Sequence, residues 1–168
     1  MNDFLVPEAP SRNLYSELLS SMTEIDQLKE KIACLPICSR FTDEQSEIIY
    51  SIGHAAYVQG KLDIACGIFQ FLLVYRPLDA RLLSAFGICC KRLDRLDEAI
   101  TAFTAALTLE PTKLNHYMHL AETLAAAGLT NESMEILEPL IDISSLADSY
   151  IAVHKRAIIM KEMLKQPL

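Results

Sequence analysis

The stretch from Gly53 to Pro77 reads GHAAYVQGKLDIACGIFQFLLVYRP, and its pattern of small, aromatic and proline residues returns at a fixed interval. Residues of this stretch recur 34 positions further on: Gly53 as Gly87, Ala65 as Ala99, Phe69 as Phe103 and Pro77 as Pro111. A period in the thirties, carried by segments with helical spacing, is typical of solenoids built from pairs of helices. The stretch therefore predicts a repeat architecture.

Aligned on this period, the chain contains three units, 46–79, 80–113 and 114–147. Helical periodicity covers nearly the whole chain and no segment alternates strictly, so we expect an all-α fold. The first unit places apolar, small and proline residues at eight shared positions: Ile49, Ile52, Gly53, Ala56, Ala65, Phe69, Leu72 and Pro77. This set resembles the tetratricopeptide signature, which implies a solenoid of three helix pairs with flanking N-terminal and C-terminal helices.

Each recurrent position has an expected physical role. Gly53 and Gly87 on the first helices are predicted to face small residues on the second, because small side chains allow close helix packing. Phe69 and Phe103 are expected to wedge toward the next pair. The prolines lack an amide hydrogen and disfavour helix in the preceding residue, so they should end the second helices.

The segments around the repeats predict further organisation. We expect a flexible N-terminus at 1–12, an N-terminal helix and linker at 13–40, repeats over 41–147 and a C-terminal capping helix at 148–168. Thr42 and Gln45 offer a capping box for the first repeat. Two apolar stripes mark the flanking helices: Leu18, Met22, Ile25, Leu28, Ile32 and Leu35 in the first, and Val153, Ala157, Met160 and Leu164 in the last.

Composition narrows the possible functions. The formal charge of −7 argues against nucleic-acid binding, which requires a basic face. The start of the chain lacks the pattern of a signal peptide, and its longest strongly apolar run, FLLV, is too short to span a membrane. With a mean hydropathy of +0.22, the chain is predicted to be a folded cytoplasmic protein without membrane insertion.

The sequence offers little support for catalysis or for a cofactor. Five scattered cysteines do not suit a disulfide framework, so we expect reduced and mostly buried thiols. Cys34 and Cys38 lack a second pair at zinc-like spacing. His116, His119 and Glu122 stand three apart and are compatible with metal ligands, but a polar helix face is favoured. No phosphate loop or nucleophile motif is present, so neither an enzyme, a metal nor a cofactor is expected.

A binding groove is the expected functional feature. The tetratricopeptide resemblance implies that the first helix of each pair lines the concave side. That register selects Glu47, Tyr50, His54, Tyr57, Val58, Arg81, Ser84, Ile88, Lys91, Arg92, Asn115, Met118, Glu122, Ala125 and Ala126. The lining should be aromatic in the first repeat, cationic in the second, and composed of small apolar residues in the third. The spacing of Tyr50, His54 and Tyr57 is also compatible with positions in the core. Because other residues of the same helix already fill the packing positions, we favour exposure of these three side chains to the groove.

A narrower resemblance covers about residues 45–145. Tyr50 and Tyr57 around Gly53, the GKLDIA turn, the passage IFQFLLVYRPLDARLLSAFGICC and the pair Ala121-Glu122 resemble the SycD-type class II chaperones of bacterial type III secretion. The resemblance implies a chaperone in the bacterial cytoplasm that keeps a secreted translocator protein, its client, soluble before export. It also implies that Tyr50, His54 and Tyr57, helped by Ile88, contact the apolar anchors of an extended client segment.

Two other functions remain open at this stage. Tetratricopeptide chaperones of the needle subunit share the skeleton but hold an amphipathic helix, and a generic scaffold for protein assembly has the same repeats. The N-terminal stripe from Leu18 to Leu35 also predicts a homodimer in the absence of the client.

Overall fold

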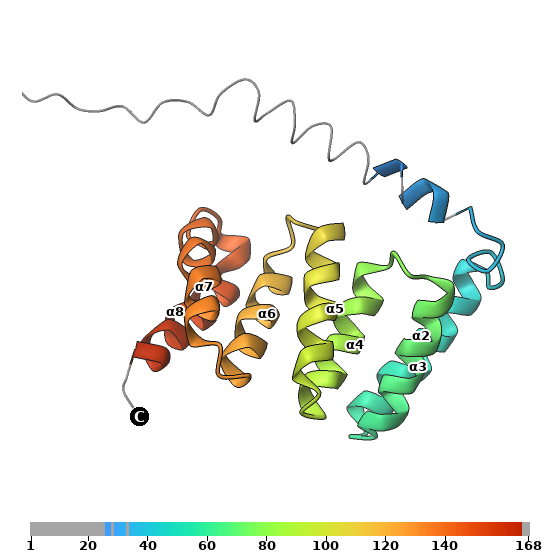
Figure 1. Ribbon diagram of the computed structural model, residues 1–168, viewed down its shortest axis with the longest axis horizontal. Coiled ribbons are helices and arrows are strands. Elements are labelled where there is room, and N and C mark those ends of the chain that lie inside the picture. The colour runs from blue at the N-terminus through green and yellow to red at the C-terminus, as the bar shows by residue number, and fades with distance from the viewer. Residues whose placement is uncertain (1–25, 28, 33, 166–168) are drawn as a thin grey trace, which may run out of the picture.

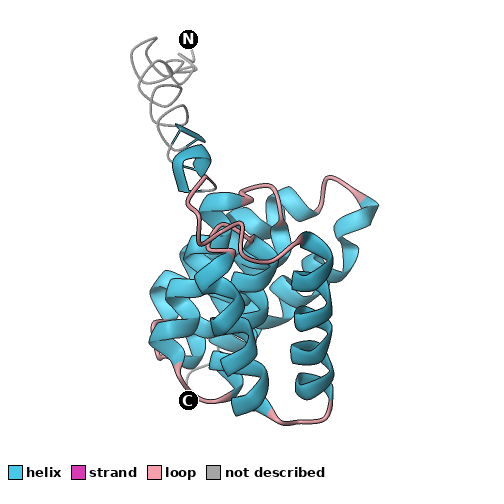
Figure 2. Cartoon of the chain, turned by 90° about the vertical axis from the view of Figure 1, so that its right-hand side faces the viewer, coloured by secondary structure: helices cyan, strands magenta, loops and turns pink. Residues whose placement is uncertain are grey.

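The computed structural model describes residues 26–27, 29–32 and 34–165, and this part of the chain contains helices and loops but no strand (Figure 2). Residues 26–27 and 29–32 are helical. The elements that follow are α2 (Asp43–Val58), α3 (Leu62–Tyr75), α4 (Ala80–Arg92), α5 (Leu96–Leu109), α6 (Leu114–Ala126), α7 (Thr130–Ser144), the 3-10 helix η1 (Asp148–Tyr150) and α8 (Ile151–Lys165). The prediction of an all-α fold is confirmed.

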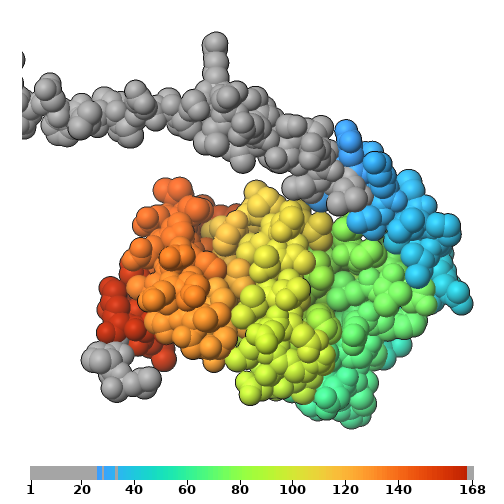
Figure 3. Space-filling view, viewed as in Figure 1, coloured from blue at the N-terminus to red at the C-terminus, as the bar shows by residue number. Residues whose placement is uncertain are grey.

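The helices pack in chain order as three antiparallel pairs, α2 with α3, α4 with α5 and α6 with α7 (Figure 1). Each second helix also contacts the first helix of the next pair, and α8 packs against α7 and α6. In the space-filling view the successive pairs cover successive bands of the surface from α2 and α3 at one end to α8 at the other (Figure 3). This sequential packing is the solenoid that the 34-residue period predicts.

The helix ends follow from local side-chain chemistry. Thr42 Oγ1 accepts a hydrogen bond from the amide of Gln45 at 3.2 Å, and Gln45 Oε1 accepts one from the amide of Thr42 at 3.0 Å, which completes the predicted capping box. Asp79 caps α4 by accepting from the amides of Arg81 and Leu82. Helices α3 and α5 each end two residues before a proline, Pro77 and Pro111, as expected.

The turns inside the pairs require a left-handed backbone. Gly60 and Gly128 have φ of 77° and 79°, and Asp94 takes the same role in the middle pair with φ of 61°. Aspartate tolerates this region better than most residues because its short polar side chain can bond locally. The three turns therefore share one geometry despite the different residue in the second.

The helix glycines receive the aromatic rings of their own pair. A Cβ atom added to Gly53 would lie 2.9 Å from Phe69, and one added to Gly87 would lie 2.9 Å from Phe103. The side chains nearest to both glycines are therefore phenylalanine rings of the second helix. Phe103 also reaches the next pair as predicted, since its ring stacks on His119 with centroids 5.4 Å apart.

Substituting Gly87 with alanine is expected to lower the free energy of unfolding. The new methyl group would press against the fully buried ring of Phe103, and overpacking of this kind costs about 1–2 kcal/mol. Gly67 is the matched control, because it lies exposed within α3 and nothing stands within 4 Å of its added Cβ. Gly67→Ala should therefore stabilise by about 0.5–1 kcal/mol through helix propensity. Urea denaturation that moved both variants in the same direction would contradict this packing.

Two apolar clusters form the core. The first joins α2 to α6 around Phe69, Leu72 and Phe103, and the second joins α6, α7 and α8 around Met118 and Leu137. The predicted stripe of the C-terminal helix lies in the second cluster, with Val153 and Ala157 buried and Met160 and Leu164 packed against them. The last helix therefore covers the end of the array.

One predicted core position is wrong. The repeat pattern predicts that Ile52 packs within its pair, but 56% of its surface is exposed. No helix pair precedes α2 in the described part of the chain, so the face that α2 would turn toward an earlier pair carries Ile52 uncovered. The positions Leu18, Met22, Ile25 and Leu28 of the N-terminal stripe, and the expected flexible segment 1–12, lie outside the described residues.

Candidate functional site

The first helices of the three pairs line a groove with a cavity of about 550 Å³. Six of the predicted site residues line it together: Tyr50, His54, Tyr57, Arg81, Ser84 and Ile88. Asn115 of α6 lies at the same cavity, as the register predicts. The cavity volume falls within the range of about 300–1,000 Å³ that is usual for ligand pockets.

The aromatic wall comes from α2. Tyr50, His54 and Tyr57 follow one another at spacings of four and three, which places them on one helix face. Tyr50 lies 5.4 Å from Phe69 between ring centroids and 6.4 Å from His54. Tyr50 and Tyr57 are both partly buried and pack against the core, so the expectation that neither takes part in packing is wrong. His54 is exposed.

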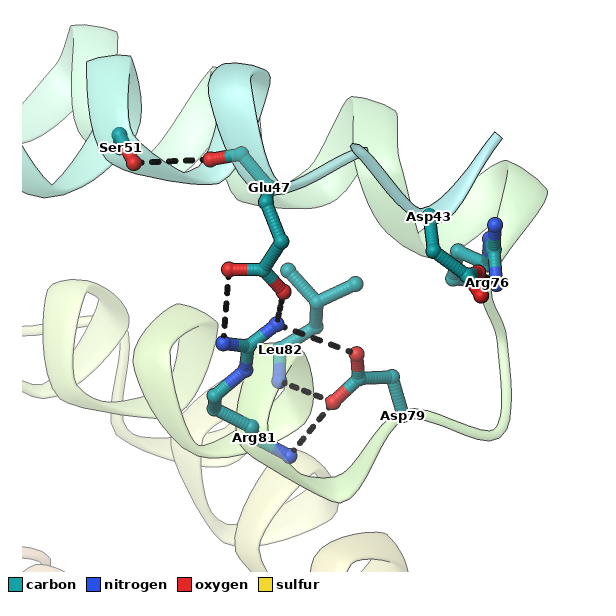
Figure 4. A network of polar contacts seen from close by, with 7 residues as sticks. All are labelled: Asp43, Glu47, Ser51, Arg76, Asp79, Arg81 and Leu82. Carbon is teal, nitrogen blue, oxygen red and sulfur yellow. Dashed lines mark hydrogen bonds and ion pairs between the residues drawn. The ribbon is translucent and has the colours of Figure 1, made fainter. Parts of the chain in front are cut away.

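Arg81 of the groove lies between the carboxylates of Glu47 and Asp79 (Figure 4). Its guanidinium binds both carboxylate oxygens of Glu47 and lies 4.3 Å from the ring centroid of Tyr50. The hydrogen bond from Arg81 holds the pKa of Glu47 below its usual value, while burial raises the pKa of Tyr50. The bidentate pair joins α2 to α4 and orients the cation across the aromatic wall.

The cavity is also lined by five residues that the sequence register does not select. They are Phe69, Ala85, Glu110, Lys113 and His116. His116 is buried, shares a hydrogen bond of 2.8 Å with Ser84 and lies 3.5 Å from Glu110. Glu110 and Lys113 belong to the loop between α5 and α6, and a register that counts only first helices misses such loop positions.

Lys91 and Glu122 bind one another instead of lining the cavity. Lys91 Nζ donates to Glu122 at 2.7 Å, Arg156 of α8 binds the other oxygen of that carboxylate, and His119 Nδ1 lies 3.6 Å away. Burial acts to raise the pKa of Glu122, but its contacts with His119, Lys91 and Arg156 outweigh it and hold that pKa far below the usual range. The cluster ties α4, α6 and α8 together.

Three further predicted residues lie outside the cavity. Met118 is only 1% exposed and belongs to the core of the last pair, so its prediction as a groove residue is wrong. Arg92, at the end of α4, places its guanidinium 5.1 Å from the ring centroid of Tyr57 and so backs the aromatic wall. Val58 is exposed at the end of α2.

His116, His119 and Glu122 do not form a plain polar helix face as expected. His116 is bound to Ser84, and His119 stacks on Phe103 beside Glu122, so these residues make contacts between helices. Among the described residues no group of three histidine, cysteine or acidic side chains is placed to hold a metal ion.

Three of the five thiols are buried in the core. Cys66 and Cys90 place their sulfur atoms 3.8 Å apart, and Cys89 lies beside them in the same cluster. Burial raises the pKa of Cys89 to about 11 and that of Cys90 to about 12, which keeps both thiols protonated and unreactive at neutral pH. They act as packing residues. Within the described part of the chain, no helix has the length and apolar character needed to cross a bilayer.

The fold and groove place this chain among the tetratricopeptide-like helix-pair solenoids. No protein-family model matches the sequence, and no curated protein matches it. Solved structures do. PcrH of Pseudomonas aeruginosa, in complex with the chaperone-binding region of PopD, shares 22% identity over 74% of this chain and 94% of its own, with a TM-score of 0.70.

Two further solved structures have a similar fold. SycD of Yersinia enterocolitica, bound to a peptide of the translocator YopD, is 23% identical over 76% of this chain and 97% of its own, with a TM-score of 0.70. A type III secretion complex from Aeromonas hydrophila reaches a TM-score of 0.74 at 23% identity, covering 85% of this chain and 95% of its own. SycD has also been solved as an alternative dimer. The chain therefore has the fold of the type III secretion translocator chaperones, as its sequence resemblance predicts.

Proposed function

We propose that this protein is a cytoplasmic chaperone of bacterial type III secretion that binds a translocator protein through the groove of α2, α4 and α6. The observation that carries the proposal is the groove itself, in which Tyr50, Tyr57 and Ile88 surround a cavity of about 550 Å³. PcrH and SycD, which share the fold, are bound to segments of translocators. Binding of an aggregation-prone client would keep it soluble until export.

The groove suits an extended segment with a few apolar anchors. Its lining comes from the first helices α2, α4 and α6, from Phe69 of α3 and from the loop between α5 and α6, so a bound chain crosses several helices and meets a different pocket wall at each. Each fully buried apolar anchor gains about 1.5–3 kcal/mol, and two or three of them account for micromolar binding after the costs of association.

Co-expression with the neighbouring secretion reading frames tests the proposal. The client is expected to co-purify with the chaperone, to remain soluble and to stay largely unfolded by circular dichroism. A client that binds as an amphipathic helix would instead support the needle-subunit alternative, and a partner that is folded in isolation would support a scaffold. A client that stays soluble when it is expressed without this chain would overturn the chaperone function.

A homodimer that covers the exposed end of the array is a second part of the proposal. Ile48 and Ile52 stand 34 residues before Leu82 and Phe86, which α4 uses to pack on α3. Leu82 is 2% exposed, whereas Ile48 and Ile52 are 57% and 56% exposed. The repeat position that is buried at Leu82, inside the array, is therefore exposed to solvent at Ile48, on the first helix of the array. A second copy, together with segment 13–40, would cover this surface.

Charged side chains introduced on the exposed face of α2 should therefore prevent self-association. Ile48→Glu combined with Ile52→Glu is expected to yield a monomer at concentrations at which the wild type sediments as a dimer, because both carboxylates would be buried in the contact. Ile159→Glu is the matched control, since Ile159 is 60% exposed on α8 at the opposite end. A monomeric wild type, or a dimer that survives the double substitution, would remove this contact.

A further inference from the structure

We propose that residues 4–10 of the chain itself, Phe-Leu-Val-Pro-Glu-Ala-Pro, occupy the groove while no client is bound. The inference rests on the groove of the proposed function being a binding surface, and it adds a built-in competitor for that surface. The occupant is the N-terminal segment of the same molecule.

The chemistry of residues 4–10 matches what the groove accepts. Phe4, Leu5 and Val6 offer three consecutive apolar anchors. Pro7 and Pro10 fix their own φ and disfavour helix in the residues before them, so a segment with this sequence binds as an extended chain at low entropic cost. The segment also carries an anion, Glu8, and a second anion, Asp3, precedes it.

The groove offers complementary groups. Tyr50, Tyr57 and Ile88 supply apolar and aromatic surface for the anchors. Lys113 lines the same cavity, is exposed, and makes no ion pair within the described part of the chain. Its ammonium group is therefore available to a carboxylate of the bound segment, whereas Arg81 is already engaged by Glu47.

The chain passes close to this groove near the start of the described part. Ile32 and Cys38 line a neighbouring cavity of about 430 Å³ together with Arg76, Asp79 and Glu110. Glu110 also lines the groove, so the two cavities adjoin. The chain between Pro10 and Ile32 spans about 30 Å even if wholly helical, which matches the roughly 20–30 Å across three neighbouring helices.

Because residues 4–10 are covalently linked to the groove, even weak binding of this segment would keep the groove occupied. A linker of this length holds the segment at an effective concentration of about 1 mM, so an intrinsic dissociation constant near 0.1 mM would leave about nine-tenths of the grooves occupied. An external ligand of the groove would then bind about tenfold more weakly than to an empty groove. A client with higher affinity displaces the segment, and the groove stays covered at other times.

The test uses a labelled peptide of residues 1–12, MNDFLVPEAPSR, titrated by fluorescence anisotropy with two full-length proteins. The variant Leu5→Asp with Val6→Asp has lost its internal competitor and is expected to bind the peptide about tenfold more tightly than the wild type. Adding Tyr57→Ala to that variant should weaken the peptide again. Equal affinity of variant and wild type, or no binding of the peptide to the variant, would overturn the proposal.

Two controls separate the loss of the competing segment from an effect of added charge and from binding between two copies. Ser16→Asp with Ser20→Asp adds the same two charges outside residues 4–10, and it should bind the peptide as the wild type does. The chain contains no tryptophan, so Phe4→Trp supplies a single reporter whose blue-shifted emission should not change on dilution. A red shift on dilution would assign the segment to a second copy and overturn docking within one molecule. The titration involves this chain alone, so its failure leaves the co-purification of a client unaffected.

Discussion

Truncating Tyr57 to alanine is expected to weaken binding of the purified client about tenfold or more. Tyr57 lines the groove, and the guanidinium of Arg92 lies over its ring, 5.1 Å from the ring centroid. Its removal takes away one wall of an anchor pocket, and each buried anchor is worth about 1.5–3 kcal/mol. Isothermal titration calorimetry with the client segment gives the change directly.

The control must separate lost binding from lost stability, because Tyr57 also packs against the core. Tyr75→Ala is a suitable match. Tyr75 is likewise partly buried and lies in an aromatic cluster outside the groove, 4.8 Å from Phe41 and 5.0 Å from Phe71 between ring centroids. Both variants should melt at a lower temperature, but only Tyr57→Ala should lose affinity. Equal affinities for the two variants would place client binding on another surface.

The repeat could be predicted from sequence because its determinants are local. Thr42 and Gln45 bond to one another's backbone, Pro77 and Pro111 act on the residue before them, and Gly60 adopts φ of 77° within a turn. Each of these effects depends on neighbours a few residues away. Their recurrence at a fixed interval therefore defines the helix pairs without knowledge of tertiary contacts.

The groove could be predicted only in part, because its other members depend on contacts between repeats. The α2 register correctly brings Tyr50, His54 and Tyr57 to the cavity. Carried to α6, the same register selects Met118, but α8 packs over the last pair and Met118 is buried beneath it. A periodic rule fails where the array ends, since the end is covered by an element that does not repeat.

The register of the groove also does not predict the charge pairs between distant residues. Lys91 and Glu122 are 31 positions apart, and Glu47 and Arg81 are 34 apart. Spacings close to the repeat length place two side chains at neighbouring positions on adjacent first helices. Opposite charges at that interval are a signal that would have identified both pairs, and would have shown that these cations are already neutralised.

Replacing Glu122 with glutamine should loosen the C-terminal helix. The change leaves Lys91 and Arg156 without their shared carboxylate, and loss of one partner in a partly buried charge cluster costs about 2 kcal/mol. For a domain of this size we expect the melting temperature to fall by about 4–8 °C. Hydrogen exchange of the amides in α8 should accelerate, because Arg156 joins that helix to α6.

The pH dependence supplies a second and independent measurement. The pKa of Glu122 is depressed from its usual value of 4.5, so the stability it contributes is present above about pH 4.5 and is lost as pH falls toward the folded-state pKa. The difference between wild type and Glu122→Gln should therefore be largest at neutral pH and narrow on acidification. Glu98→Gln is the matched control, because Glu98 forms an exposed pair with Arg95 three residues away and its loss should leave the melting temperature nearly unchanged. Equal melting temperatures for the two variants, or a difference that stays constant with pH, would show that the cluster does not anchor α8.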